Sequence, residues 1–70
     1  MAKTYADYSL YQEIRDKKQL TDYAVAEGAK VATATISNWK SGIYAPKIDK
    51  LMKIAGFLGV PLESLLRTEK

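Results

Sequence analysis

Apolar residues recur at intervals of three or four along this chain of 70 residues, and this spacing constrains the fold more than any other feature. The clearest stripe consists of Ile48, Leu51, Ile54, Ala55 and Leu58. Residues spaced in this way share one face of an α-helix. Pro46 suits the start of that helix, where its missing N–H is harmless, and Gly59 suits its end. No segment alternates strictly between apolar and polar residues, so no strand is predicted.

The other apolar stripes, together with the residues that begin and end helices, predict five short helices in all. They are expected over residues 7–17, 21–28, 33–41, 46–59 and 61–67, after a flexible arm at residues 1–6. Thr21 is a suitable N-cap because its hydroxyl can accept a hydrogen bond from a backbone N–H of the first turn. Glu63 and Arg67 are four residues apart and are expected to pair. A chain of this length has room for one domain, over residues 1–70.

The composition excludes several kinds of chemistry. The sequence contains no cysteine and no histidine, which removes disulfides, thiol nucleophiles, cysteine–histidine zinc sites and the commonest general acid–base residue. Its eight acidic residues are scattered, and none lies with a histidine, a cysteine or a glycine-rich loop. The chain is therefore not expected to be an enzyme, and no metal or cofactor is expected.

Nothing in the sequence predicts a membrane location. No stretch approaches the roughly 20 consecutive apolar residues that span a bilayer, and the first residues lack the apolar core of a signal peptide. A cytoplasmic protein is expected. The formal net charge of +3 mildly favours a polyanionic partner.

The second and third predicted helices carry the most informative arrangement. Two helices that cross closely need a small residue at the crossing, and Ala26 supplies it. Ile36 follows ten residues later, the separation that a short helix, a tight turn and one helical turn require. The apolar residues that would wedge the two helices together are Val25, Val31, Ile36 and Trp39. This wedge leaves an outward face of short polar side chains on the third helix.

With these residues the chain resembles the phage-repressor or Cro-like (Xre-type) helix-turn-helix domains, from about Tyr8 to Leu66. The resemblance rests on Leu20-Thr21, Val25-Ala26, Val31, the string Thr35-Ile36-Ser37-Asn38-Trp39-Lys40-Ser41-Gly42, and the apolar tail from Leu51 to Leu66. It implies an all-α, five-helix lambda-repressor-like domain that contains a helix-turn-helix. It also implies a double-stranded DNA operator as the partner.

Carried over residue by residue, the resemblance assigns two sets of DNA contacts. Base contacts in the major groove fall to Thr33, Ala34, Ser37 and Asn38. Contacts to the DNA backbone fall to Thr21, Lys30, Lys40, Ser41, Tyr44 and Lys47. Asn38 is the strongest base reader because a carboxamide can form two hydrogen bonds with adenine. The alternative for the base readers is a solvated position on the helix, and Tyr44 could instead pack within its loop.

The chain departs from the family pattern at four positions. Lys30 stands where a turn glycine is usual, and Ala32 stands where a Ser or Thr usually caps the recognition helix. Asp22 replaces a common Gln and is expected to repel phosphate. Lys40 occupies the position of a Glu that pairs with an arginine of the first helix, so Arg15 is expected to lack that partner.

The aromatic residues allow two interpretations. Trp39 could stack on bases, but its spacing with Ile36 favours a place in the core. Tyr8 and Tyr11 are likewise expected in the core. Lys17 and Lys18, by contrast, are expected to be ordinary solvated charges.

Two functions are compatible with these features. The first is a transcriptional regulator, a repressor or Cro-like switch protein of phage or bacterial origin, which forms a weak homodimer or dimerises on DNA through residues 57–66. The second is a protein-interaction module on the same fold, such as a co-repressor, a modulator or an antitoxin, with little DNA binding. The absence of Arg, Gln and Lys from residues 33–39 favours this partner-protein alternative, because those residues often read bases.

Overall fold

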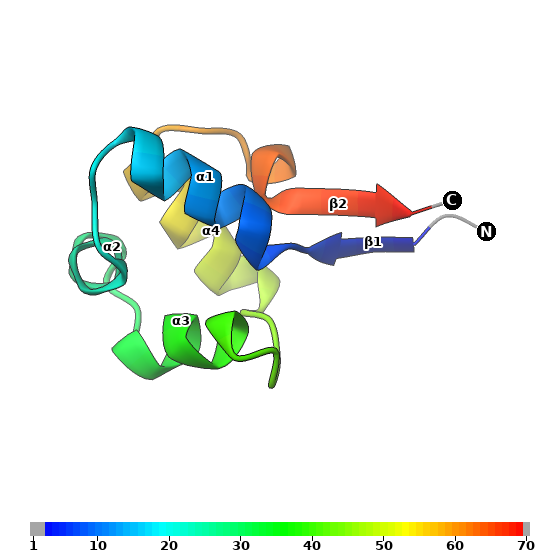
Figure 1. Cartoon of the computed structure of the whole chain (residues 1–70), viewed down its shortest axis with the longest axis horizontal. Coiled ribbons are helices and arrows are strands. Elements are labelled where there is room, and N and C mark those ends of the chain that lie inside the picture. The colour runs from blue at the N-terminus through cyan, green and yellow to red at the C-terminus, as the bar shows by residue number, and fades with distance from the viewer. Residues whose placement is uncertain (1–2, 70) are drawn as a thin grey trace.

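The computed structural model describes residues 3–69, which form four α-helices, one 3₁₀ helix and a two-stranded sheet (Figure 1). In chain order the elements are β1 (Lys3–Ala6), α1 (Tyr8–Lys17), α2 (Asp22–Ala29), α3 (Thr33–Lys40), α4 (Ile48–Leu58), the 3₁₀ helix η1 (Leu62–Leu65) and β2 (Leu66–Glu69). The helices gather around one core, and the two strands extend from it side by side as a ribbon (Figure 1).

Local signals place the first four helices, and these predictions are confirmed to within about two residues. The Asp7 carboxylate caps α1 by accepting from the Ser9 N–H at 2.8 Å. The Thr21 hydroxyl caps α2 by accepting from the Ala24 N–H at 3.1 Å. Gly59 closes α4 in the left-handed conformation, at φ +73°. The start of α4 is a correction, because it begins at Ile48 and not at Pro46.

The structure differs from two expectations, the flexible arm at residues 1–6 and the fifth helix over residues 61–67. Residues 3–6 of the expected arm form β1, whereas residues 1–2 lie outside the described part of the chain. The fifth helix is reduced to one 3₁₀ turn, after which the chain extends as β2. The expected Glu63–Arg67 pair is replaced, because the Arg67 guanidinium pairs with Asp7. The described fold is therefore mostly helical with a small sheet.

Cross-strand pairs explain the ribbon. The strands are antiparallel and place Lys3 opposite Glu69 and Thr4 opposite Thr68, so opposite charges and matching hydroxyls face each other. The two threonine hydroxyls are 3.1 Å apart. At its base the ribbon joins the helical core through a hydrogen bond from the Asp7 N–H to the Leu65 carbonyl at 2.9 Å.

The core lies between all four α-helices and η1. Its buried members are Tyr11, Val25, Ala26, Ala29, Val31, Ile36, Trp39, Leu51, Ile54, Ala55, Leu58 and Leu65. The predicted crossing residue Ala26 and all four wedge residues belong to this set, so the wedge prediction is confirmed. Ile48, the first residue of the α4 stripe, points outward and is 57% exposed.

Within residues 3–69, no helix is long and apolar enough to cross a membrane.

Candidate nucleic-acid interface

The turn between α2 and α3 forms without a glycine. Lys30 ends α2 in the left-handed conformation, at φ +59°, which disfavours residues that have a Cβ atom. The turn is closed by hydrogen bonds from the Lys30 N–H to the Glu27 carbonyl at 3.2 Å and from the Val31 N–H to the Ala26 carbonyl at 3.0 Å. Lys30 is exposed and lies three residues before Thr33, the first residue of α3.

The first turn of α3 lacks a side-chain cap, as the alanine at its N-cap predicts. Ala32 has the extended backbone of an N-cap residue and offers no side-chain hydrogen bond. Its carbonyl accepts a hydrogen bond from the Thr35 N–H at 3.0 Å. The first turn of α3 therefore begins with a backbone hydrogen bond alone and without a capping side chain.

The outward face of α3 carries the predicted base readers. Thr33, Ala34 and Ser37 are exposed, whereas Ile36 and Trp39 on the opposite face are buried. In Figure 1, α3 runs along the edge of the molecule opposite α1. The structure thus leaves one side of α3 open over its whole length.

Asn38 differs from the other three predicted readers. It is half-buried, and its side-chain amide donates a hydrogen bond to the Tyr44 hydroxyl at 2.8 Å. Tyr44 lies in the loop that follows α3 and is itself exposed. This contact was not predicted from the sequence.

Two surface hollows flank α3, and three of the six predicted backbone contacts, Lys40, Tyr44 and Lys47, line them. The first, of about 360 Å³, is lined by Asp22, Tyr23, Thr33, Ser37 and Lys40. The second, of about 530 Å³, is lined by Thr35, Tyr44, Ala45, Pro46, Lys47 and Lys50. The second hollow brings together two lysines and two hydroxyls. Lys50 and Thr35 were missed by the sequence reasoning, although Lys50 lies one helical turn after Lys47.

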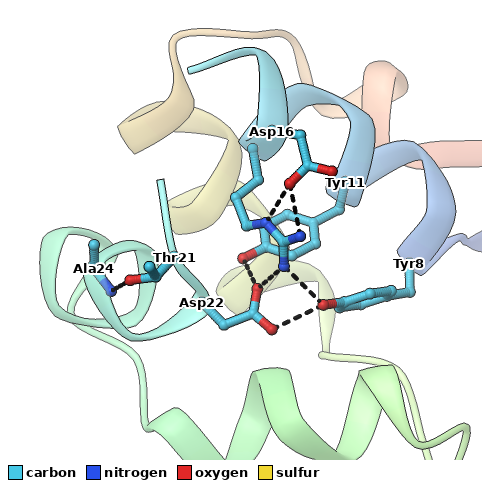
Figure 2. Close-up of polar contacts among 7 residues, drawn as sticks. Tyr8, Tyr11, Asp16, Thr21, Asp22 and Ala24 are labelled. Carbon is cyan, nitrogen blue, oxygen red and sulfur yellow. Dashed lines mark hydrogen bonds and ion pairs between the residues drawn. The ribbon is translucent and has the colours of Figure 1, made fainter. Parts of the chain in front are cut away.

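A polar network at the start of α2 joins Asp22 to Arg15, a contact that the sequence analysis did not predict (Figure 2). The Asp22 carboxylate accepts hydrogen bonds from Arg15 at 2.6 Å and from the hydroxyls of Tyr8 and Tyr11 at 2.8 Å each. Arg15 also pairs with Asp16 at 2.7 Å. Arg15 therefore finds its acidic partner on α2 instead of α3. Asp22 is thus held in an ion pair, and it also lines the hollow that contains Lys40, so its repulsion of phosphate stays a prediction.

The pKa values of this network follow from burial and hydrogen bonding. Burial raises the pKa of the Asp22 carboxyl, but the hydrogen bonds from Arg15, Tyr11 and Tyr8 outweigh it and lower that pKa below its ordinary value. Burial and the bond to Asp22 raise the pKa of the Tyr11 hydroxyl well above its ordinary value. Besides Asp16, the network therefore holds the Asp22 carboxylate, one guanidinium and two neutral hydroxyls at neutral pH.

Trp39 joins α3 to the rest of the molecule. Its side chain is 5% exposed, and its ring lies 5.6 Å from that of Tyr8 and 5.1 Å from that of Tyr11, centroid to centroid. Its indole N–H donates to the Ala6 carbonyl at 3.4 Å, at the end of β1. The predicted core position of Trp39 is confirmed, and a stacking role on bases is incompatible with this burial.

Within residues 3–69, no three acidic side chains lie close enough together to hold a metal ion.

Comparison with known proteins agrees with this geometry. A family model described as helix-turn-helix matches residues 12–65, which include α2, the turn and α3. The chain therefore belongs to the helix-turn-helix family, as its resemblance to the Cro-like domains predicted.

A particular relative is the HTH-type transcriptional activator BcrR of Enterococcus faecalis, to which the chain is 36% identical over 59 residues. That match covers 84% of this chain and 29% of the activator. The chain thus spans less than a third of the length of this relative.

Proposed function

We propose that this chain is a sequence-specific regulator of transcription that binds double-stranded DNA and reads the major groove with α3. The observation that carries the proposal is the open face of α3, on which Thr33, Ala34 and Ser37 are exposed beside Asn38. Short polar side chains on the second helix of a helix-turn-helix lie where base edges are read. Membership of the family and the likeness to a transcriptional activator support this function.

The proposed half-site consists mainly of A·T pairs. Asn38 is suited to adenine, and the methyl groups of Thr33 and Ala34 are suited to the methyl group of thymine. The outward face has no arginine to contact guanine, and such contacts are the commonest specific contacts in the major groove. A guanine contact at one edge remains open to Lys30, which lies in the turn before α3.

The proposed phosphate contacts lie on both sides of α3. Lys40 and Ser41 are exposed at its C-terminal end, whereas Tyr44 and Lys47 line the larger hollow. Thr21 and Lys30 would contact the backbone from α2 and the turn. We add Lys50 to this set because it lines the same hollow as Lys47.

The proposed biological role is that of a repressor or Cro-like switch protein of phage or bacterial origin. The relative is named an activator, but this chain covers only 29% of it. A reporter gene placed behind the selected operator decides the direction. Expression that falls when the protein is present supports a repressor, and expression that rises refutes it.

The proposed assembly is a weak homodimer, or a dimer that forms on DNA, through residues 57–66. Phe57 is 42% exposed there, and Leu62 and Leu66 are half-buried. Two such domains would read half-sites about ten base pairs apart. Sedimentation with and without operator tests this, and a single chain bound to a site without two-fold symmetry would refute it.

Selection of bound sequences from a random DNA pool, followed by titration of variants, tests the function. Asn38→Ala should remove the preference at one adenine, worth about 1–3 kcal/mol, and leave binding to random duplex nearly unchanged. Lys40→Ala and Lys47→Ala should each weaken binding to all sequences and reduce the salt slope by about one unit. Lys17→Ala is the matched control, because Lys17 is exposed on α1 and should not contact DNA. A guanine-rich selected core would refute the proposed readers.

The second candidate is a protein-interaction module, and exposed apolar side chains favour it. Tyr23, Ile43, Ile48 and Met52 are each more than half exposed. Apolar side chains of this kind can mark a surface that binds another protein. Binding to random duplex at two salt concentrations separates the candidates: a DNA binder shows steeply salt-dependent affinity, whereas an interaction module shows little binding at either concentration.

A further inference from the structure

The hydrogen bond between Asn38 and Tyr44 links the strongest predicted base reader to the loop after α3. The Asn38 Nδ2 group donates to the Tyr44 hydroxyl oxygen at 2.8 Å. Asn38 is half-buried and Tyr44 is 55% exposed, so the pair lies at the edge of the open face of α3. The bond joins two residues that were assigned separate roles, one toward bases and one toward the DNA backbone.

A carboxamide that reads adenine must have one particular orientation. It accepts with Oδ1 from the adenine amino group and donates with Nδ2 to the adenine ring nitrogen. Rotation by half a turn about the last side-chain bond exchanges these two ends and presents the wrong pattern. Nδ2 carries two protons, and the contact with adenine uses only the proton on the same side as Oδ1. The other proton is free to bond elsewhere.

We infer that Tyr44 is a positioning residue for base reading, whose hydroxyl holds the Asn38 carboxamide in the orientation that matches adenine. The inference rests on the proposed function, because it concerns how α3 reads DNA. In this arrangement the Nδ2 proton on the far side from Oδ1 bonds Tyr44. The proton beside Oδ1 and the oxygen itself remain available to the base.

The loop that carries Tyr44 is built to hold this position. Gly42 takes the left-handed conformation at φ +78°, which turns the chain back along α3. The Ile43 N–H then donates to the carbonyl of Asn38 itself at 3.0 Å, and the Gly42 N–H donates to the Trp39 carbonyl at 3.1 Å. Pro46, two residues after Tyr44, is buried. The backbone of the loop is thus anchored on both sides of Tyr44, which keeps this residue close to Asn38.

The Tyr44 hydroxyl keeps its own proton when it accepts from Asn38. That proton can be donated to a phosphate oxygen, since Tyr44 lines the hollow that also contains Lys47 and Lys50. Contact with the DNA backbone would then strengthen the hold on Asn38, because hydrogen bonds in a chain polarise one another. A single tyrosine would in this way connect docking on the backbone to the reading of one base.

The test removes only the hydroxyl, by Tyr44→Phe, in the full chain. Nuclear magnetic resonance of the free protein should show a shift of the Asn38 Nδ2 proton on the far side from Oδ1 and little change in the other. Titration with the selected operator, and with operators that replace the contacted adenine, should show a three- to tenfold loss of preference, about the value of one hydrogen bond. The salt slope should not change, because a neutral hydroxyl releases no counterions.

Two controls isolate the positioning role. Tyr5→Phe removes a comparable hydroxyl, which donates to Glu69 at 3.1 Å on the ribbon, and should alter neither the Asn38 protons nor the base preference. In an Asn38→Ala background, Tyr44→Phe should have no further effect on preference at that base pair. A further loss there would mean that Tyr44 reads the base itself, which overturns the inference.

The remaining outcomes are equally decisive. A Tyr44→Phe variant with full adenine preference overturns the inference and leaves the proposed function standing. A shift confined to the proton beside Oδ1 also overturns it, because Tyr44 would then compete with adenine. A wild-type protein that selects no sequence refutes the proposed function itself, and this inference with it.

Discussion

Replacement of Asp22 by Asn tests the network that joins α1 to the helix-turn-helix. The carboxylate receives three hydrogen bonds, from Arg15 and from the hydroxyls of Tyr8 and Tyr11. Tyr11 is fully buried and the Arg15 side chain is only 14% exposed, so water cannot fully replace the lost acceptor. Arg15 keeps its ion pair with Asp16 in this variant, which reduces the loss of stability.

The expected loss of stability is large for so small a domain. A hydrogen bond to a charged group contributes about 1.5–3 kcal/mol, and bonds that share one acceptor do not add fully. The amide of Asn keeps one acceptor oxygen, so we expect Asp22→Asn to cost about 2–3 kcal/mol. A domain of this size has roughly 4–10 kcal/mol in total. Urea unfolding followed by circular dichroism at pH 7 measures the loss.

The pH dependence of this loss of stability gives a second test of the network. Because the pKa of Asp22 is lowered in the folded state, its contribution is complete above the unfolded value of about 3.9 and is lost as the pH falls through the folded-state pKa. The difference in the free energy of unfolding between the wild type and Asp22→Asn should therefore be constant from pH 6 to 8. It should shrink as the pH falls below about 4. Asp49→Asn is the control, since Asp49 lies in the first turn of α4 but is exposed. A gap below about 0.5 kcal/mol at pH 7, or one that does not close in acid, would refute the reasoning.

Two further predictions concern packing. Trp39→Ala should cost about 3–5 kcal/mol and largely unfold the domain in thermal melts, because it empties a site against two tyrosine rings; a folded variant that has lost only DNA binding would contradict this. Gly28→Ala would place a Cβ within 2.1–2.6 Å of the Phe57 ring, so it should destabilise the wild type but stabilise a Phe57→Ala background by up to about 1 kcal/mol in urea unfolding. The control is Gly56→Ala, because a Cβ atom at Gly56 has no neighbour within 4 Å, and it should stabilise the wild type by about the same amount. If Gly28→Ala also stabilised the wild type, the clash with Phe57 would be excluded.

Local chemistry explains why the helices could be predicted and the ribbon could not. The N-cap at Thr21 and the closing glycine at Gly59 act within one helical turn of their own element, so they can be recognised in a single sequence. The two strands of the ribbon have four residues each and come from opposite ends of the chain. Thr4 and Thr68, which face each other, are 64 positions apart. Neither strand alternates clearly by itself, and only their alignment reveals the matched partners.

The same distinction between local and long-range contacts applies to the candidate site. The open face of α3 was predictable because burial of Ile36 and Trp39 determines which residues face outward. The partner of Arg15 was not, because it depends on how α1 packs against α2. Sequence comparison within a family assigns the acid to α3, but in this chain Asp22 reaches the same guanidinium from α2 at 2.6 Å.

Packing against the core determines the stability and orientation of α3 more than its own helix-forming residues do. α3 has only eight residues and no side-chain N-cap, so it would not be stable alone. It is held by Ile36 and Trp39, and Trp39 in turn contacts the ring of Tyr8, whose hydroxyl bonds Asp22. The side chains proposed to read bases are therefore positioned by packing on the opposite face of the same helix. Substitutions that loosen this packing should therefore impair base reading, even though they change no residue that is proposed to contact DNA.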